Sequence, residues 1–157
     1  MIAGYCIGAG VALAAACDLR VAATGARFGI PAARLGIGYF YAGVKQLVDL
    51  VGPAQAKRLL FTGDKFGAEE MLRIGLVDEV VAAQHLSERV SALAAAIAAN
   101  APLSVAAAKF AVATARSDGA PDVAACSAQE AACNNSEDHA EGRRAFLEKR
   151  VPKFQGH

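Results

Sequence analysis

A Gly8-Ala9-Gly10 turn that opens directly into an alanine-rich stretch is the feature that most limits the folds open to this chain. The residues before the turn are apolar and those after it favour a helix, so the turn is expected to lead into a helix N-terminus. The first turn of a helix carries unpaired backbone N–H groups, and the helix dipole adds positive charge there. The segment therefore predicts a site for an anion, or for a carbonyl oxygen that becomes negative during a reaction.

The length and the net charge of the chain limit the class of protein to which it can belong. At 157 residues, the chain is long enough for one domain with a buried core. Its net charge is +1, with 16 basic and 15 acidic side chains, which argues against a nucleic-acid partner. No charge-free run of about 18 apolar residues occurs, so no membrane span or membrane partner is expected. The N-terminus lacks the charged region of a signal peptide, and the expected compartment is cytoplasmic.

The four cysteines, Cys6, Cys17, Cys126 and Cys133, do not form a metal-binding pattern. None makes a Cys-x-x-Cys pair, and no histidine stands at ligand spacing beside them. The sequence therefore predicts no metal site and four reduced, largely buried thiols. A nucleophilic Cys6 is the alternative, because a helix N-terminus lowers the pKa of a nearby thiol.

The chain changes character near its middle. Residues 1–83 alternate short apolar runs with glycine-containing turns, which indicates an α/β core. One helix in this part is expected to end at Gly52-Pro53, where a second begins. Residues 84–157 keep helical spacing, with Ser136 as the N-cap of the last helix. The expected elements are strands at 18–23 and 76–81, an extended piece at 28–31, and helices at 86–97, 103–115, 122–133 and 136–150.

By itself, the Gly8-Ala9-Gly10 turn is equally typical of a structural turn. A dinucleotide-binding fingerprint would place a third glycine where this chain has Leu13, and no suitable acidic residue follows. Further motifs along the chain help to decide whether this turn is structural or functional. They are Cys-Asp-Leu-Arg-Val-Ala at 17–22, Arg-Phe-Gly-Ile-Pro at 27–31, Leu-Phe-Thr-Gly-Asp at 60–64, Arg-Ile-Gly-Leu-Val at 73–77 and Ala-Phe-Leu-Glu-Lys-Arg at 145–150. In this order and spacing, the chain resembles the crotonase (enoyl-CoA hydratase/isomerase) superfamily along essentially its whole length.

That resemblance implies a crotonase-like α/β fold, in which a partial spiral of ββα units precedes a helical region that builds a trimer or hexamer. Family members bind acyl-CoA thioesters and stabilise an enolate or related oxyanion at the thioester carbonyl. One of the two backbone N–H donors matches Ala9, flanked by Gly8 and Gly10. The other comes from an upstream loop, so the resemblance also implies that this chain lacks the N-terminal half of the fold.

Two positions depart from the hydratase pattern. Family hydratases use a pair of glutamates, and the matching residues here are Ala12 and Ala32. Because neither alanine can move a proton, the two-glutamate hydration mechanism is not expected. The resemblance leaves Tyr39 and Tyr41 as the polar side chains near the reacting carbon. A tyrosine in this loop is similar to the one that the decarboxylase branch of the family carries, whose hydroxyl orients a carboxylate. Plain packing of both tyrosines with solvated hydroxyls is the alternative.

Phe146 and Lys149 lie three residues apart on one face of the last expected helix. In the family, the matching residues reach the CoA adenine of a neighbouring subunit, by stacking and by a charge near phosphate. The alternative is a solvated helix end with Phe146 packed in the core.

The sequence leaves two functions open. The first is an acyl-CoA enzyme of the hydratase/isomerase type, a lyase or isomerase of fatty acid metabolism that needs no cofactor besides the CoA of its substrate. The second is a non-catalytic crotonase-like assembly or CoA-binding module, which Ala12 and Ala32 favour. Both imply a homo-oligomer, a trimer or hexamer, with CoA or an acyl-CoA thioester as the ligand.

Overall fold

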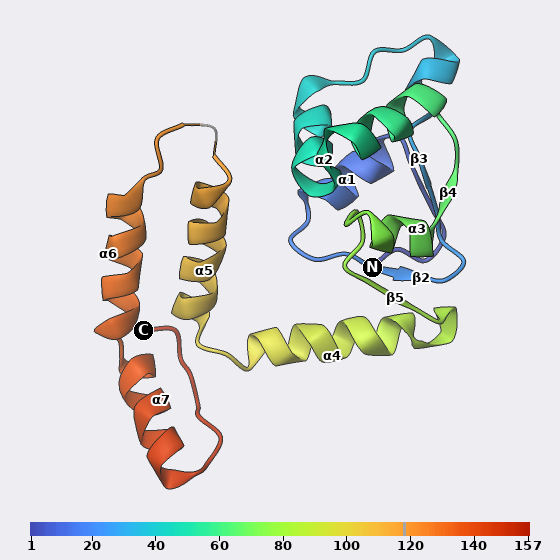
Figure 1. The fold of residues 1–157 in the computed structure, drawn as a ribbon. Helices are drawn as coiled ribbons and strands as arrows, with labels where there is room; N and C mark the ends of the chain where they lie inside the picture. Colours follow the sequence, from blue (N-terminus) through green and yellow to red (C-terminus); the bar gives the residue numbers. More distant parts are fainter. Residues whose placement is uncertain (118) are drawn as a thin grey trace. The chain divides into compact units, whose positions relative to one another are not determined.

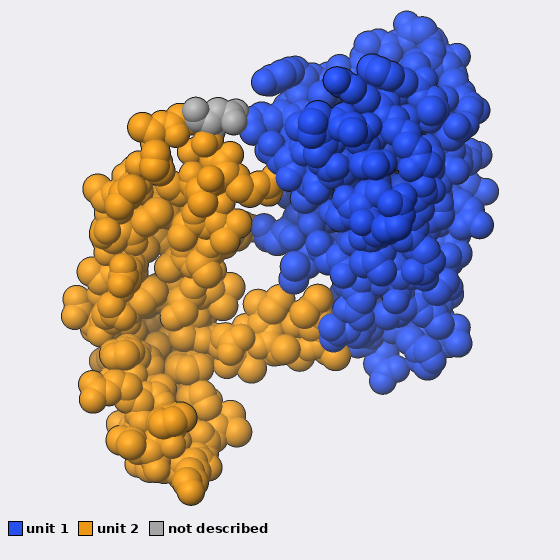
Figure 2. All heavy atoms as spheres, in the orientation of Figure 1, with its two compact units in different colours: residues 1–91 blue, residues 92–157 orange. Residues whose placement is uncertain are grey.

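The computed structural model describes residues 1–117 and 119–157, which form two compact units (Figure 2). The first unit comprises Met1–Ser91 and the second Ala92–His157. This division falls within helix α4 (Leu86–Ala98). The domain boundary expected at residues 83 and 84 stays a prediction.

Unit 1 is an α/β structure built on two small sheets (Figure 1). In the first sheet, β1 (Tyr5–Ile7) pairs in parallel with β3 (Arg27–Gly29), which pairs antiparallel with β4 (Phe66–Gly67). In the second, β2 (Val21–Ala23) is parallel to β5 (Glu79–Val81). Parallel neighbours cannot be joined by a hairpin, so helices lie between the paired strands in the sequence.

The helices of unit 1 supply these connections. α1 (Ala9–Ala16) follows β1, and α3 (Ala68–Arg73) follows β4. α2 (Tyr41–Thr62) consists of two helical pieces joined at Gly52, whose φ of 73° lies in the left-handed region, and Pro53 begins the second piece. The predicted break at this Gly-Pro pair is confirmed, because glycine accepts that φ and proline fits a helix start. The short 3-10 helices are η1 (Pro31–Leu35) and η2 (Ala83–His85).

The core of unit 1 gathers side chains from almost every one of its elements. The largest that are fully buried are Val11, Phe28, Ile30, Leu47, Met71, Leu76 and Val77. α1 packs against α2, and α3 packs against β3 and β5. Burying one side chain of this size stabilises the fold by about 1.5–3 kcal/mol. This packing fixes the end of β1 and the start of α1, where the Gly8-Ala9-Gly10 turn lies.

An ion pair between the buried Arg20 and the more exposed Asp78 joins the residue before β2 to the residue before β5. Arg20 is 5% exposed and donates from Nη2 to Asp78 Oδ1 at 3.1 Å and from Nη1 to the Cys17 carbonyl oxygen at 2.6 Å. Its backbone N–H donates to Asp78 Oδ2 at 2.6 Å. A charge buried this deeply requires such partners. The strand expected at 18–23 therefore begins only at Val21.

The second unit is helical. It contains the end of α4, then α5 (Pro102–Ala115), α6 (Val123–Asn134) and α7 (Glu137–Glu148), and α5 and α6 pack side by side (Figure 1). Ser136 caps α7, because its hydroxyl accepts a hydrogen bond of 3.0 Å from the backbone N–H three residues on. The N-cap predicted at this serine is confirmed.

No single helix in the described part of the chain is long and apolar enough to cross a membrane. The helical segments Ala83–Ala98 and Pro102–Ala115 are long and apolar enough for a membrane span only when taken together, and the chain bends by 104° between them. A break at this point is expected, because proline cannot continue the preceding helix.

The last residues of the chain fold back along α7. Asp138, which is buried, accepts hydrogen bonds of 2.6 and 2.8 Å from two consecutive backbone N–H groups of this tail. Glu141 accepts a hydrogen bond of 2.9 Å from Arg150 Nη2 and one of 3.0 Å from the Lys153 backbone N–H. Hydrogen bonds from Arg150 and then Arg144 hold the pKa of Glu141 well below its usual range. The ionised carboxylate therefore stabilises the tail at neutral pH, and this contribution is lost as the pH falls into the acid range.

Gly29 allows β3 to pass close to the loop after α2, and its substitution tests that packing. A Cβ added here would lie 2.6 Å from the Asp64 carbonyl oxygen, a backbone atom that cannot swing aside. We expect Gly29→Ala to lower the free energy of unfolding by about 1–3 kcal/mol, measured by urea denaturation. Gly4→Ala is the matched control, because nothing lies within 4 Å of its added Cβ. Equal losses in the two variants would contradict the close approach.

Candidate functional site

The candidate site is the junction between β1 and α1. Gly8 stands there with a φ of 56°, which glycine adopts without a steric penalty. Its N–H donates to the Gly29 carbonyl oxygen at 2.8 Å, and its own carbonyl oxygen accepts from the Val11 N–H at 3.0 Å. The turn is therefore held by β3 on one side and by the first helical turn on the other.

The backbone N–H groups of Ala9 and Gly10 have no acceptor within residues 1–117 and 119–157. They are the first two N–H groups of α1, so no helical carbonyl lies one turn before them. Ala9 is exposed and Gly10 is half-buried. Two free donors at the positive end of a helix dipole can bind an anion or a carbonyl oxygen.

Tyr39 reaches the same turn from the loop before α2. Its hydroxyl donates to the Gly8 carbonyl oxygen at 3.1 Å. Its ring centroid lies 4.9 Å from that of Phe40, and both rings pack over Gly43, where an added Cβ would collide with them. The ring is thus fixed by packing, and its hydroxyl rests on the carbonyl that begins α1.

Both titratable groups at the turn are neutral at pH 7. Burial raises the pKa of the Cys6 thiol, which lies beneath Gly10. Burial also raises the pKa of the Tyr39 hydroxyl, the neighbouring Cys6 raises it further, and a hydrogen bond from the Ala12 backbone partly opposes this. Desolvation therefore outweighs the activation considered for Cys6 as a nucleophile. None of the cysteines forms a disulfide within the described residues.

The other candidate residues of unit 1 differ in exposure. Tyr41 is the first residue of α2 and is 79% exposed, so its side chain lies in solvent. Ala12 in α1 and Ala32 in η1 are both partly buried, and Ala32 packs against the core. The structure thus brings Tyr39, but not Tyr41, onto the turn. No group of three or more His, Cys, Asp or Glu side chains that could hold a metal ion occurs in the part of the chain described.

The candidate residues of unit 2 lie on α7. Phe146 is 83% exposed, so it does not pack in the core of this unit. It lines a cavity of about 410 Å³ together with Phe154, Arg143 and His139. Aromatic faces beside a guanidinium group can hold a flat ring and a phosphate.

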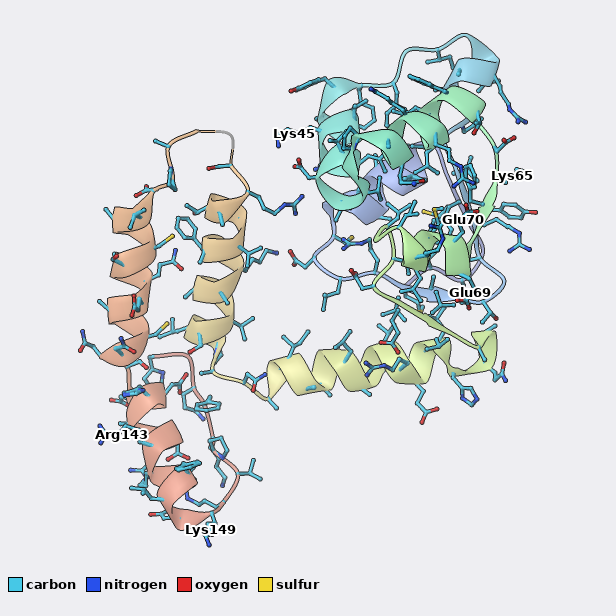
Figure 3. All side chains as sticks on the ribbon, in the orientation of Figure 1. Lys45, Lys65, Glu69, Glu70, Arg143 and Lys149 are labelled. Atoms are coloured by element: carbon cyan, nitrogen blue, oxygen red, sulfur yellow. The ribbon has the colours of Figure 1, made fainter. Side chains whose placement is uncertain are left out.

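Lys149 ends α7 in the left-handed conformation, with a φ of 53°, which is uncommon for a residue with a Cβ. Its N–H donates to the Phe146 carbonyl oxygen at 3.3 Å, and the Arg150 N–H donates to the Ala145 carbonyl oxygen at 3.0 Å. These two bonds form a Schellman C-cap that joins Lys149 to Phe146 through the backbone. Figure 3 shows Lys149 at the end of α7, beyond Arg143 on the same helix.

Two features of these sites escaped the sequence analysis. The contact between Tyr39 and Gly8 joins residues 31 positions apart, so no local pattern reveals it. Arg143 shares the cavity with Phe146. The position of Arg143 could have been predicted from the sequence, because Arg143 and Phe146 are three residues apart on a helix and therefore share a face.

Comparison with known proteins identifies the class. The sequence matches the enoyl-CoA hydratase/isomerase family over residues 1–157, and the chain belongs to that family. Its fold is crotonase-like: it superposes on an enoyl-CoA hydratase/isomerase family protein from Hyphomonas neptunium with a TM-score of 0.91 at 37% identity, over 98% of this chain and 59% of that one.

Relatives with named activities are matched to a similar extent. The chain is 39% identical to a crotonyl-CoA hydratase from Syntrophomonas wolfei, over 96% of its own length and 58% of that protein. It is 36% identical to a 2,3-dehydroadipyl-CoA hydratase from Escherichia coli, over 98% of its own length and 60% of that protein. The chain thus spans about three fifths of the length of these relatives.

Two substitutions of Lys149 separate backbone strain from charge. Glycine accepts a positive φ, whereas alanine keeps the clash of the Cβ, and both remove the charge. We therefore expect Lys149→Gly to have a free energy of unfolding about 1 kcal/mol above that of Lys149→Ala, measured by urea denaturation. Equal stabilities would mean that the left-handed cap does not persist in solution.

Proposed function

We propose that this protein is an acyl-CoA-binding enzyme of the hydratase/isomerase type, which stabilises the oxyanion or enolate of a thioester at the start of α1. The observation that carries the proposal is the pair of unpaired N–H groups of Ala9 and Gly10 at a helix N-terminus. Membership of the family supports it, and the two named relatives take crotonyl-CoA and 2,3-dehydroadipyl-CoA.

In the proposed mechanism, the thioester carbonyl oxygen accepts a hydrogen bond from the Ala9 N–H, with Gly8 and Gly10 shaping the turn. Negative charge grows on that oxygen as the enolate forms, so the fixed N–H and the helix dipole stabilise the transition state more than the ground state. One such donor contributes about 10²–10³ in rate. The second donor is proposed to come from outside residues 1–157.

Proton transfer in the proposed site does not follow the two-glutamate route, because Ala12 and Ala32 carry no titratable group. Tyr39 is proposed to hold the turn through its hydrogen bond to Gly8. With its raised pKa, the Tyr39 hydroxyl donates hydrogen bonds at neutral pH and does not act as a base. Tyr41 is proposed as a residue of the rim, where its exposed ring contacts the acyl group.

The CoA part of the substrate is proposed to reach Phe146 and Lys149 of a neighbouring subunit in a homotrimer or hexamer. Phe146 stacks on the adenine and Lys149 lies near a phosphate in this arrangement. Exposed apolar side chains on the helices of the second unit, such as Ile97, Val112 and Val123, support an oligomer. The CoA is part of the substrate in this proposal. No further cofactor and no nucleic-acid or membrane partner is proposed, and the proposed compartment is cytoplasmic.

A non-catalytic CoA-binding module is the second candidate function. Two points favour it. The resemblance to the family aligns Ala12 and Ala32 with the glutamates of its hydratases, and the Cys6 and Tyr39 side chains beside the turn are protonated at neutral pH. In this alternative, the N–H groups of Ala9 and Gly10 bind the thioester carbonyl without a proton transfer to follow.

Calorimetric titration of the 157-residue chain with CoA and with crotonyl-CoA tests the proposal. We expect saturable binding of both ligands, and tighter binding of the thioester because it alone offers a carbonyl oxygen to Ala9. Assays of hydration, isomerisation, decarboxylation and thioester hydrolysis then identify the reaction. Binding without turnover would favour the non-catalytic module, and no binding by a folded sample of known oligomeric state would refute both functions.

Tyr39→Phe tests the role of the hydroxyl on the turn. We expect a loss of about 0.5–1.5 kcal/mol in the free energy of unfolding, since one hydrogen bond is removed. The affinity for crotonyl-CoA is expected to fall more than that for CoA, because only the thioester uses the Ala9 N–H. Tyr41→Phe is the matched control, since that side chain is exposed. Parallel losses of affinity for both ligands would argue against a role at the carbonyl.

A further inference from the structure

The hydroxyl of Tyr39 makes two hydrogen bonds to the first turn of α1. It donates to the Gly8 carbonyl oxygen at 3.1 Å and accepts from the Ala12 backbone N–H. The Ala12 nitrogen also lies 3.4 Å from the Gly8 oxygen, which is long for a helical hydrogen bond. The hydroxyl therefore bridges the donor and the acceptor of a long helical bond, in the turn that carries the unpaired N–H groups of Ala9 and Gly10.

Packing against Phe40 and Gly43 holds the Tyr39 ring. The ring centroids of Tyr39 and Phe40 are 4.9 Å apart. Both rings lie against Gly43, because a Cβ added there would be 2.7 Å from the Phe40 Cζ and 3.0 Å from the Tyr39 Cε1. Gly43 is buried, whereas Phe40 is 53% exposed. The two rings therefore fill the space that a side chain at position 43 would need.

The backbone of α2 gives no reason for a glycine at position 43. Gly43 is the third residue of α2 and is not among the glycines with a positive φ. Its N–H donates to the Phe40 carbonyl oxygen at 3.1 Å, a bond that any residue other than proline can make. Alanine favours a helix over glycine, so the helix by itself would be more stable with a side chain here. What glycine provides at this position is room for two aromatic rings.

We infer that Gly43 and Phe40 are positioning residues for the proposed carbonyl site. The space left by Gly43 allows both aromatic rings to pack on the start of α2. Phe40 then holds the Tyr39 ring so that its hydroxyl reaches the first turn of α1, and the start of α2 is thereby linked to the free N–H groups. The inference rests on the proposed function, since it assigns these residues a role for a thioester bound at Ala9.

A methyl group at position 43 breaks this arrangement whichever ring gives way. If the Phe40 ring moves into solvent, Tyr39 loses the ring that packs against it. If the Tyr39 ring moves, its hydroxyl leaves the Gly8 carbonyl oxygen. One hydrogen bond changes an equilibrium constant by about two- to tenfold. We therefore expect Gly43→Ala and Phe40→Ala each to weaken the binding of crotonyl-CoA by about that factor, with little change in the binding of CoA.

The ionisation of Tyr39 reports its position without any ligand. The chain has three tyrosines and no tryptophan, so Tyr5→Phe together with Tyr41→Phe leaves Tyr39 as the one phenol that ultraviolet absorbance follows. In this parent variant we expect the pKa of Tyr39 to lie above the usual tyrosine value, because burial disfavours the phenolate. Gly43→Ala or Phe40→Ala, added to the parent, is expected to lower that pKa, since the displaced ring is more solvated.

Gly38→Ala is the matched control in the same loop. Nothing lies within 4 Å of its added Cβ, so we expect it to change neither the pKa of Tyr39 nor the affinity for crotonyl-CoA. Calorimetry of Gly43→Ala in the Tyr39→Phe chain then shows how the effect is transmitted. If Gly43 acts through the hydroxyl, this second substitution causes no further loss of affinity for the thioester. Circular dichroism of each variant checks its folding.

Three results would overturn the inference. The first is an unchanged pKa of Tyr39 in folded Gly43→Ala or, if that variant does not fold, in Phe40→Ala, where an exposed ring is removed. The second is a loss of thioester affinity on Gly43→Ala that persists in the Tyr39→Phe chain. The third is an equal change on Gly38→Ala. The absorbance titration needs no ligand, so it still decides how Tyr39 is positioned if the unsubstituted chain binds no thioester, a result that would refute the proposed function instead.

Discussion

The hydrogen bond of 2.8 Å from the Gly8 N–H to the Gly29 carbonyl oxygen joins the β1–β3 ladder to the start of α1. It fixes the plane of the turn, and with it the direction of the Ala9 and Gly10 N–H groups. β3 can take this position because Gly29 leaves room beside the Asp64 carbonyl. The donors are backbone groups, so their placement depends on the sheet and not on which side chains surround it. A site built in this way survives changes of side chain at neighbouring positions.

Electrostatics at the turn come from the backbone. Cys6 and Tyr39, the titratable side chains in contact with it, are kept neutral mainly by burial. Neither side chain therefore adds a negative charge that would cancel the partial positive charge of the helix start, and this favours a ligand with a partial or developing negative charge. The buried guanidinium of Arg20 is paired instead with Asp78, and this pair joins the starts of the parallel strands β2 and β5.

In the second unit, α7 carries carboxylates in its first turns, and Lys149, the residue after its last, has a positive φ. Asp138 and Glu141 hold the returning tail through its backbone N–H groups, and the tail brings Phe154 to the cavity beside Phe146. Lys149 keeps a positive φ that glycine would adopt at lower cost. Strain retained at an exposed charged residue fits a position used for binding, because packing alone does not require lysine there.

Local patterns in the sequence determined much of the secondary structure. The break at Gly52-Pro53 and the cap at Ser136 were predictable, because each depends on neighbours within one helical turn. The sequence likewise predicted that the turn at Gly8 begins a helix whose first backbone N–H groups are unpaired. Only the tertiary structure decided that the Tyr39 hydroxyl rests on that turn, and that Arg20 finds its partner 58 residues away. Such contacts depend on how strands distant in sequence pair and how helices pack on them, and no local periodicity encodes that arrangement.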